Sequence, residues 1–264
     1  MIVAMKQRES VYLEKSLKLL ERWLPQSVPA MMEEYLSKPR EEADWNVEED
    51  SHGYVYCVFS WPETGSERIV LLVYDDDMRI IADCSAVHCS VTDLLSDTAL
   101  FDALCDESDW MYLSHYTLCA AMFPSVPYPP AGERIAAEGE ALLYSNAYVT
   151  KAYRRRGIFT VMDEIMREFA LRSISGSAVL YTSFSLDPDI AVYGQDAVST
   201  PYHYNFETDE PDRMRNKAIL EKRGFEVIRL QETEEDPDAD GTKLWFAVRR
   251  ENDVIIDLEK ESVS

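Results

Sequence analysis

The sequence predicts an α/β protein in which helices flank a mixed β-sheet, and two observations support this fold class. In the second half of the chain, segments with strand composition alternate with segments of helical spacing, which is typical of a sheet with at least one parallel strand pair. The chain has 264 residues, 46% of them hydrophobic, which is enough for one substantial core. We therefore expect a single domain over 1–264, with an enlarged N-terminal portion over 1–130, a core over 131–250 and a C-terminal tail over 251–264.

The N-terminal portion is predicted to contain helices followed by short strands. Leucines at helical spacing end at Pro25, which indicates a first helix, and apolar residues over 31–36 indicate a second, short one. Segments rich in Val, Ile, Tyr and Phe predict strands over 53–61, 68–74 and 78–81. Before the last of these, the run Asp75, Asp76 and Asp77 indicates a solvated turn.

The pattern is weak in the middle of the chain and sharper after it. Residues 86–107 show mixed helical patterns, 110–119 has the composition of a strand, and the proline-rich stretch 124–130 predicts a hinge or a rigid surface loop. Beyond it, strands are predicted over 141–149, 178–184, 225–230 and 243–248, and helices over 158–171 and 211–223. The acidic run over 232–240 is interpreted as a solvated loop.

The charge of the chain bounds its partners. Lysine and arginine total 26 against 49 acidic residues, so the formal net charge is −23. Such a surface repels the phosphates of nucleic acids and of anionic lipids, so we expect neither nucleic acid nor membrane as a partner. It would attract a cationic amine, although solubility alone also explains it. Because no run approaches the roughly 18 apolar residues of a membrane span and the N-terminus soon turns charged, we expect a cytoplasmic protein. Nothing in the sequence indicates an oligomeric state.

Five cysteines, an odd number without a CxxC pair, favour reduced thiols over a disulfide framework: Cys57, Cys84, Cys89, Cys105 and Cys119. Cys84, His88 and Cys89 stand close enough in the sequence to suggest a metal site, but a second ligand pair at suitable spacing is missing. We therefore expect no bound metal and interpret the cysteines as small buried side chains.

The segment around Gly157 carries the main functional signal. Apolar residues at helical spacing begin at Ile158, so the predicted helix has its amino terminus near Gly157. Arg154, Arg155 and Arg156 precede it, although the partial positive charge and free N–H groups of a helix amino terminus favour acidic neighbours. An anionic ligand would remove this mismatch, since N–H groups can cradle phosphate oxygens and glycine leaves room for them. The alternative is a solvated basic turn that balances nearby acidic residues.

Two segments resemble the GNAT N-acetyltransferase family. The stretch NAYVTKAYRRRGIFTVMDEIM is similar to the family's central acyl-CoA-binding motif, in which a strand is followed by Arg/Gln-x-x-Gly-x-Gly/Ala and a helix. Downstream, NKAILEKRGFEVIR resembles the family's later helix-turn-strand motif, which ends in Gly-Phe. The resemblance covers about a third of the chain. It implies a GNAT-type, partly splayed sheet and an acyltransferase that uses acetyl-CoA or another acyl-CoA and a small-molecule or peptide amine.

The resemblance also implies which residues bind acyl-CoA. Ala147, Tyr148 and Val149 would offer backbone hydrogen bonds to the pantetheine arm, which lies in the gap where their strand splays from the next. The residues that would wrap the pyrophosphate are Arg154, Arg155, Arg156, Gly157, Ile158, Phe159 and Thr160. Asn216, on the later helix, is a further candidate for a pantetheine contact.

The sequence departs from the family pattern at two positions. Phe159 stands where Gly or Ala is usual, and we expect its ring to turn toward the core, which would leave the phosphate cradle open. Leu220 stands where many members have a tyrosine that protonates the leaving thiolate. The usual general acid is therefore missing.

The resemblance implies direct attack by the amine in a ternary complex, with a strand N–H near Val149 as the oxyanion donor. Tyr202 or Tyr204 is a candidate to replace the missing acid, and His203 is a candidate base, although tyrosines packed over the core would give the same pattern. A cysteine nucleophile is disfavoured because no histidine stands beside a cysteine in the motif region. The competing function class is a non-catalytic module that binds acyl-CoA and reports it to a partner.

Overall fold

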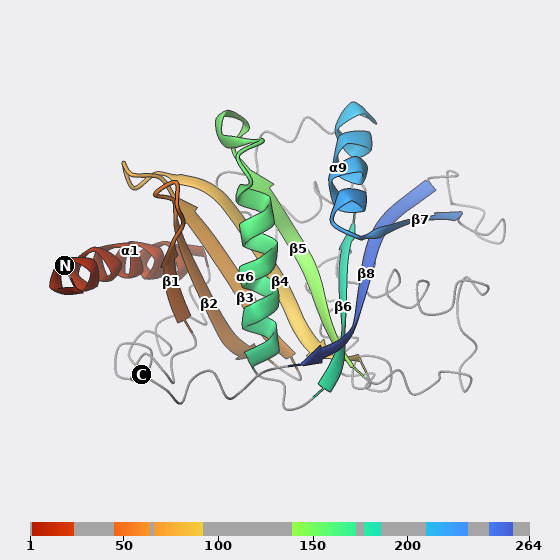
Figure 1. The fold of residues 1–264 in the computed structure, drawn as a ribbon, viewed down its shortest axis with the longest axis horizontal. Helices are drawn as coiled ribbons and strands as arrows, with labels where there is room; N and C mark the ends of the chain where they lie inside the picture. The colour runs from red at the N-terminus through yellow and green to blue at the C-terminus, as the bar shows by residue number, and fades with distance from the viewer. Residues whose placement is uncertain are drawn as a thin grey trace.

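The computed structural model describes residues 2–23, 45–63, 66–91, 139–172, 177–185, 210–231 and 243–255. They form one eight-stranded sheet in the order β1-β2-β3-β4-β5-β6-β8-β7 (Figure 1). The strands are β1 (Trp45–Glu49), β2 (Val55–Glu63), β3 (Ser66–Tyr74), β4 (Ile80–Ser90), β5 (Glu140–Val149), β6 (Ser177–Ser185), β7 (Glu226–Gln231) and β8 (Lys243–Ile255). The helices are α1 (Ile2–Trp23), α6 (Ile158–Arg172) and α9 (Glu210–Lys222), with a 3-10 helix, η2 (Lys151–Tyr153). No helix within these ranges is long and apolar enough to cross a membrane.

The strand pairing confirms the predicted mixed sheet. β1 to β5 pair antiparallel, each with the next, and β8 pairs antiparallel with both β6 and β7. β5 and β6 pair in parallel, which requires a crossover connection, and α6 lies in that crossover. The turn that leads into α6 therefore follows directly from the end of β5.

The two faces of the sheet carry separate cores because successive strand residues point to opposite sides. Tyr56 on β2 belongs to a cluster that includes Met162 and Met166 from α6. Its neighbour Cys57 belongs to a second cluster that includes Leu17 from α1. α6 therefore covers one face of the sheet, which we call the α6 face, and α1 lies on the other.

Three strands differ from the prediction. β4 extends to Ser90 instead of ending at residue 81. The helical pattern expected from residue 86 is therefore wrong for 86–90, which are the last five residues of β4. Because β4 is buried on both faces, its sequence lacks the alternation that marks a half-exposed strand. β1 was not predicted, and β8 continues to Ile255, past residue 251 where the tail was expected to begin. The predictions over 31–36, 110–119, 124–130 and 232–240 fall outside the described residues.

β5 and β6 part near the middle of β5. Their register ends at the pair Tyr144 and Phe184, whereas β5 continues to Val149. The register of β5 with β4 skips Ser145, which marks a β-bulge where the pairing with β6 stops. A bulge bends its strand, so the last residues of β5 leave the course of β6, as the predicted splayed sheet requires.

Candidate functional site

The turn between β5 and α6 has an unusual backbone. The Thr150 N–H donates to the Ile81 carbonyl at 2.8 Å, which continues the link of β5 to β4, and η2 follows. Arg155 and Gly157 then have φ angles of 68° and 81°, in the left-handed region. For a residue with a Cβ this conformation costs about 1–2 kcal/mol, and such strain is typical of ligand-binding turns.

These residues present a row of free backbone donors. The N–H groups of Thr160 and Val161 both donate to the Gly157 carbonyl, at 2.9 and 3.2 Å, and close the first turn of α6. The N–H groups from Arg155 to Phe159 have no acceptor in the part of the chain that the structure describes. A Cβ added at Gly157 would meet no atom of the described residues within 4 Å, so the turn is open toward them on that side. Free N–H groups at a helix amino terminus are typical of anion-binding sites, and left-handed residues beside them are common in such sites.

Arg154 and Arg155 differ in what they contact. Arg154 Nε donates to the Val149 carbonyl at 2.9 Å, and its guanidinium lies 5.8 Å from the centre of the Tyr148 ring. Arg155 is exposed and contacts no other described residue through a hydrogen bond, ion pair or ring. Its charge is therefore available to a ligand.

Arg156 anchors the turn to the N-terminal strands. It donates to the Tyr54 hydroxyl at 2.9 Å and lies 5.0 Å from the centre of the Tyr153 ring, and Tyr153 donates to Asp75 Oδ2 at 2.7 Å. Burial by itself would raise the pKa of Asp75, but hydrogen bonds from Tyr153 and from the Arg79 amide hold it below its ordinary value. Asp75 is 7% exposed, so the predicted solvated turn is wrong for this residue. The other two aspartates of the triplet are exposed, as predicted.

The edge of β5 beyond its pairing with β6 carries further backbone groups. In an antiparallel pair, residues alternate between bonding to the partner strand and pointing away from it. Since Thr150 bonds to Ile81, the main chain of Tyr148 also faces β4, whereas Ala147 and Val149 direct their N–H and C=O groups to the opposite edge. That edge faces the gap left where the pairing with β6 ends.

The other predicted cofactor residues lie as follows. Ile158 is buried in the core, and its neighbour Phe159 packs edge-to-face on Phe184 at 5.9 Å, so the ring turns inward as expected. The Thr160 N–H is already bonded within the helix, which leaves its hydroxyl for a ligand. Asn216 is exposed on α9 and makes no hydrogen bond within the described segments.

The Gly-Phe pair ends α9 in a Schellman motif. The Phe225 N–H donates to the Leu220 carbonyl and the Gly224 N–H to the Glu221 carbonyl, both at 3.1 Å, with Gly224 at φ 82°. Leu220 is 4% exposed and belongs with Phe225 to the core on the α6 face. The position where many GNAT members carry a tyrosine is therefore a buried anchor of the α9 terminus.

The candidates for proton transfer, Tyr202, His203 and Tyr204, lie outside the described residues. So do Cys105 and Cys119, and the structure places none of these five relative to the turn.

Cys57, Cys84 and Cys89 are buried free thiols, as predicted. Burial raises the pKa of Cys57 to about 12 and that of Cys84 well above its ordinary value, so neither is a ready nucleophile. No group of three side chains suited to a metal ion occurs in the described ranges.

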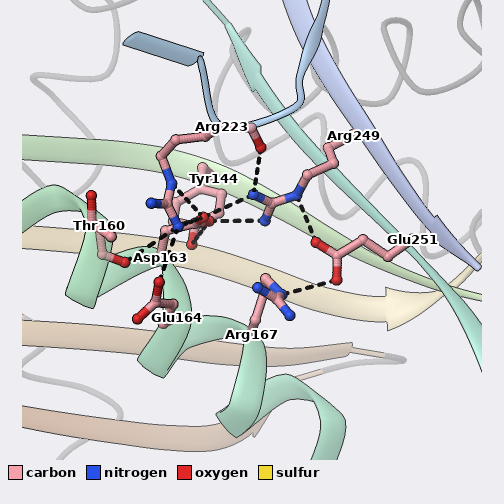
Figure 2. A network of polar contacts seen from close by, with 8 residues as sticks. All are labelled: Tyr144, Thr160, Asp163, Glu164, Arg167, Arg223, Arg249 and Glu251. Atoms are coloured by element: carbon pink, nitrogen blue, oxygen red, sulfur yellow. Dashed lines mark hydrogen bonds and ion pairs between the residues drawn. The ribbon is translucent and has the colours of Figure 1, made fainter. Parts of the chain in front are cut away.

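Sequence reasoning missed a buried ionic cluster that ends close to the turn. This Asp163 cluster consists of Asp163, Tyr144, Arg223 and Arg249 (Figure 2). Asp163 is fully buried in α6, and its carboxylate accepts hydrogen bonds from Arg223 at 2.8 and 3.0 Å and from Arg249 at 2.9 and 3.1 Å. Tyr144 donates a further one at 3.3 Å.

Burial by itself would raise the pKa of Asp163, but Arg249 and then Arg223 hold it below its ordinary value. The available signal was one charged residue beside the apolar stripe of the helix, and its two arginine partners stand 60 and 86 residues away in sequence.

A second cluster gives His88 partners that the sequence did not indicate. In this His88 cluster, Nδ1 lies 3.3 Å from Glu67 Oε2 and Nε2 lies 3.2 Å from Glu140 Oε2. Burial would lower the pKa of His88, but Glu140 and Glu67 raise it to about 9. The partners of His88 in the structure are therefore two carboxylates rather than the neighbouring cysteines.

No family model matches the sequence, and no curated protein matches it significantly. The solved structures to which this chain is similar include the apo form of an agmatine N-acetyltransferase mutant, at 11% identity and a TM-score of 0.38, with 69% of this chain and 74% of that one covered. A polyamine N-acetyltransferase from Drosophila melanogaster matches at 11% identity and a TM-score of 0.36, with 68% of this chain and 73% of that one covered. A nourseothricin acetyltransferase matches at 11% identity and a TM-score of 0.33, with 78% of this chain and 82% of that one covered. At these identities and TM-scores the matches assign no family, activity or substrate to this chain.

Proposed function

We propose that the protein is an acyl-CoA-dependent N-acyltransferase that transfers an acetyl group from acetyl-CoA to a primary amine. The observation that carries the proposal is the row of N–H groups from Arg155 to Phe159, which have no acceptor among the described residues. The exposed guanidinium of Arg155 belongs to the same turn. Backbone donors at a helix amino terminus, with an adjacent guanidinium, are suited to a diphosphate.

The turn fits the diphosphate of CoA in shape as well as in charge. Among the residues that the structure describes, no atom lies within 4 Å of a Cβ added at Gly157, so an oxygen could approach the backbone there. The positive φ at Arg155 and Gly157 would allow successive N–H groups to point toward one ligand. The hydroxyl of Thr160 would add a donor, because its N–H is already bonded to Gly157.

The edge of β5 would hold the pantetheine arm. Ala147 and Val149 direct backbone groups into the gap beside β6, where an extended amide chain can bond to them as a strand would. The side chain of Tyr148 would contribute through its contact with Arg154, and Asn216 would reach the arm from α9. A thioester bound there supplies an activated carbonyl, and the Val149 N–H would donate to the oxygen on which negative charge develops.

Proton transfer requires residues outside the described segments. The attacking amine must be neutral, so we propose His203 as the base that accepts its proton. Because Leu220 is a buried anchor without a hydroxyl, we propose Tyr202 or Tyr204 as the acid that protonates the leaving thiolate. The acceptor would be a small-molecule or peptide amine, which the net charge of −23 favours in cationic form.

Calorimetric titration of CoA into the protein tests the cofactor site. We expect Arg155→Glu to weaken CoA binding at least tenfold, because it replaces an attraction to the diphosphate by a repulsion. Arg156 is not used for this test, since it also holds Tyr54. The matched control is Arg172→Glu, at the other end of α6 and about 20 Å away, which should bind CoA with wild-type affinity. Equal affinity in the Arg155 variant and the wild type would refute the phosphate assignment.

A non-catalytic acyl-CoA sensor is the competing function, favoured by the buried leucine at position 220. Incubation with acetyl-CoA and a panel of amines, while free thiol is followed, separates the two. Amine-dependent release of CoA supports the acyltransferase. Saturable CoA binding without release by any amine supports the sensor.

A further inference from the structure

The guanidinium of Arg223 joins the end of α9 to the beginning of α6. Arg223 follows α9 directly and lies in the Schellman motif, where its N–H donates to Leu220 at 2.9 Å. Its side chain crosses to α6 and donates to Asp163 at 2.8 and 3.0 Å and to the Thr160 carbonyl at 3.4 Å (Figure 2). Glu164 lies 3.7 Å away. All three partners belong to the first two turns of α6.

The free N–H groups of the candidate site lie at the start of this helix, on Ile158 and Phe159, and in the turn directly before it, from Arg155 to Gly157. The donors are backbone atoms, so their directions change only when the helix start itself moves. A binding constellation must be held within roughly 0.5 Å of its productive geometry to keep its affinity. A side chain that ties this helix start to another element therefore bears on ligand binding without touching the ligand.

We propose that Arg223 is a positioning residue for the acyl-CoA cradle, an inference that rests on the proposed function. It holds the first turns of α6 in the orientation that directs the N–H groups from Arg155 to Phe159 at one diphosphate. The other guanidinium of the cluster, on Arg249, keeps Asp163 paired through two hydrogen bonds, so loss of Arg223 leaves no orphaned carboxylate. Removing Arg223 thus loosens the helix start while the core persists.

Arg167 offers a matched control on the same helix. Arg167 Nε lies 3.0 Å from Glu251 Oε2, so it also ties α6 to the C-terminal part of the chain (Figure 2). Its side chain is 28% exposed, against 17% for Arg223. It lies one turn farther from the cradle than Asp163 and makes no contact with the first turn of α6 among the described residues. Removing it costs one ion pair between α6 and β8, weaker than the contacts of Arg223, at a place that does not set the direction of the free N–H groups.

The experiment compares Arg223→Gln, Arg223→Lys and Arg167→Gln in the full chain by thermal unfolding and by titration with CoA. We expect Arg223→Gln to weaken CoA binding about fivefold or more, and Arg167→Gln to lower Tm while its CoA affinity stays within twofold of wild type. Arg223→Lys should keep the charge beside Asp163 but not bond Asp163 and Thr160 at once, so its affinity should lie between those of wild type and Arg223→Gln. With an accepted amine, KM for acyl-CoA should rise while kcat and the KM of the amine stay unchanged.

A double-mutant cycle of Arg223→Gln with Arg155→Gln measures the coupling between the two residues in CoA binding. A general loss of stability alone would not produce such a coupling. If Arg223 acts through the cradle, the two substitutions together should weaken CoA binding less than the product of their separate effects. Wild-type affinity in Arg223→Gln, or equal losses of affinity in the Arg223 and Arg167 variants, would overturn the inference and leave the proposed function standing. Absence of CoA binding to the wild-type protein would instead remove the proposed function, and this inference with it.

Discussion

The Asp163 cluster and the His88 cluster are two buried ionic groups of opposite sign on the same face of the sheet. Asp163 is an anion held between two guanidiniums, and His88 is a cation held between two carboxylates. His88 lies on the α6 face because β4 residues two and four positions earlier, Ala86 and Cys84, belong to the core under α6. The Asp163 cluster joins helix ends and strands, whereas the His88 cluster joins three neighbouring strands, β3, β4 and β5.

The difference between the clusters lies in which partner titrates. Arginine stays charged at every pH a protein tolerates, and the pKa of Asp163 is held below its ordinary value, so the Asp163 cluster keeps its charges from mildly acidic to alkaline pH. The central group of the His88 cluster is an imidazole with a pKa of about 9, which loses its proton in the alkaline range. One cluster is a permanent tie and the other depends on pH.

The largest expected effect comes from removing the central charge of the permanent tie. Asp163→Asn leaves two guanidiniums buried without their shared carboxylate, and we expect it to lower the free energy of unfolding by about 3–5 kcal/mol. Urea unfolding followed by circular dichroism measures this change. The control is the neighbouring Glu164→Gln, whose side chain is 53% exposed and should change stability by less than about 1 kcal/mol. A loss of about 1 kcal/mol in the Asp163 variant would show that the cluster is worth no more than a surface pair.

The next effect is the loss of stability of the wild-type protein in alkali. Burial would lower the pKa of His88, but Glu140 and Glu67 raise it to about 9, above its ordinary value of 6.5. A group whose pKa is higher in the folded state than in the unfolded state stabilises the folded protein. This contribution is complete at pH values below the unfolded pKa, and it is lost as the pH rises through the folded pKa. One pKa unit corresponds to about 1.4 kcal/mol. We therefore expect the free energy of unfolding to fall by about 3 kcal/mol at most between pH 6.5 and 9.5.

The variant His88→Gln isolates this term from the general effect of the negative net charge. It is uncharged throughout the range, so its stability should change less with pH than that of the wild type. The midpoint of urea unfolding at several pH values between 6 and 10 gives the comparison. Parallel pH profiles of the two proteins would mean that His88 does not carry the alkaline loss.

The turn before α6 could be predicted from sequence because its signals are local. The three arginines, Gly157 and the apolar stripe stand within about one helix length of each other, and helix termini follow general rules. The inward turn of Phe159 followed from its place beside that stripe. The alternation of strands and helices after residue 140 followed from periodicity in the same way.

The two ionic clusters could not be predicted because their members come from distant segments. Arg249 stands 86 residues after Asp163, and His88 stands 21 residues after Glu67. Before strand register and packing are known, each is an ordinary charged residue. β4 was missed beyond residue 81 for a related reason, since a strand buried on both faces shows no alternation. Local patterns thus indicate the candidate site, while tertiary structure decides which distant residues pack against it.

The smallest expected effect distinguishes the two carboxylates of the His88 cluster. Glu140 raises the pKa of His88 more than Glu67 does, so Glu140→Gln should lower that pKa further than Glu67→Gln. Both side chains are about a quarter exposed, at 24% and 26%, so the two variants differ little in burial. NMR titration of the His88 ring measures each pKa, and the remaining carboxylate should keep it above 6.5 in both variants. If the pKa falls below 6.5 in either variant, burial outweighs one carboxylate, and the imidazolium depends on both partners at once.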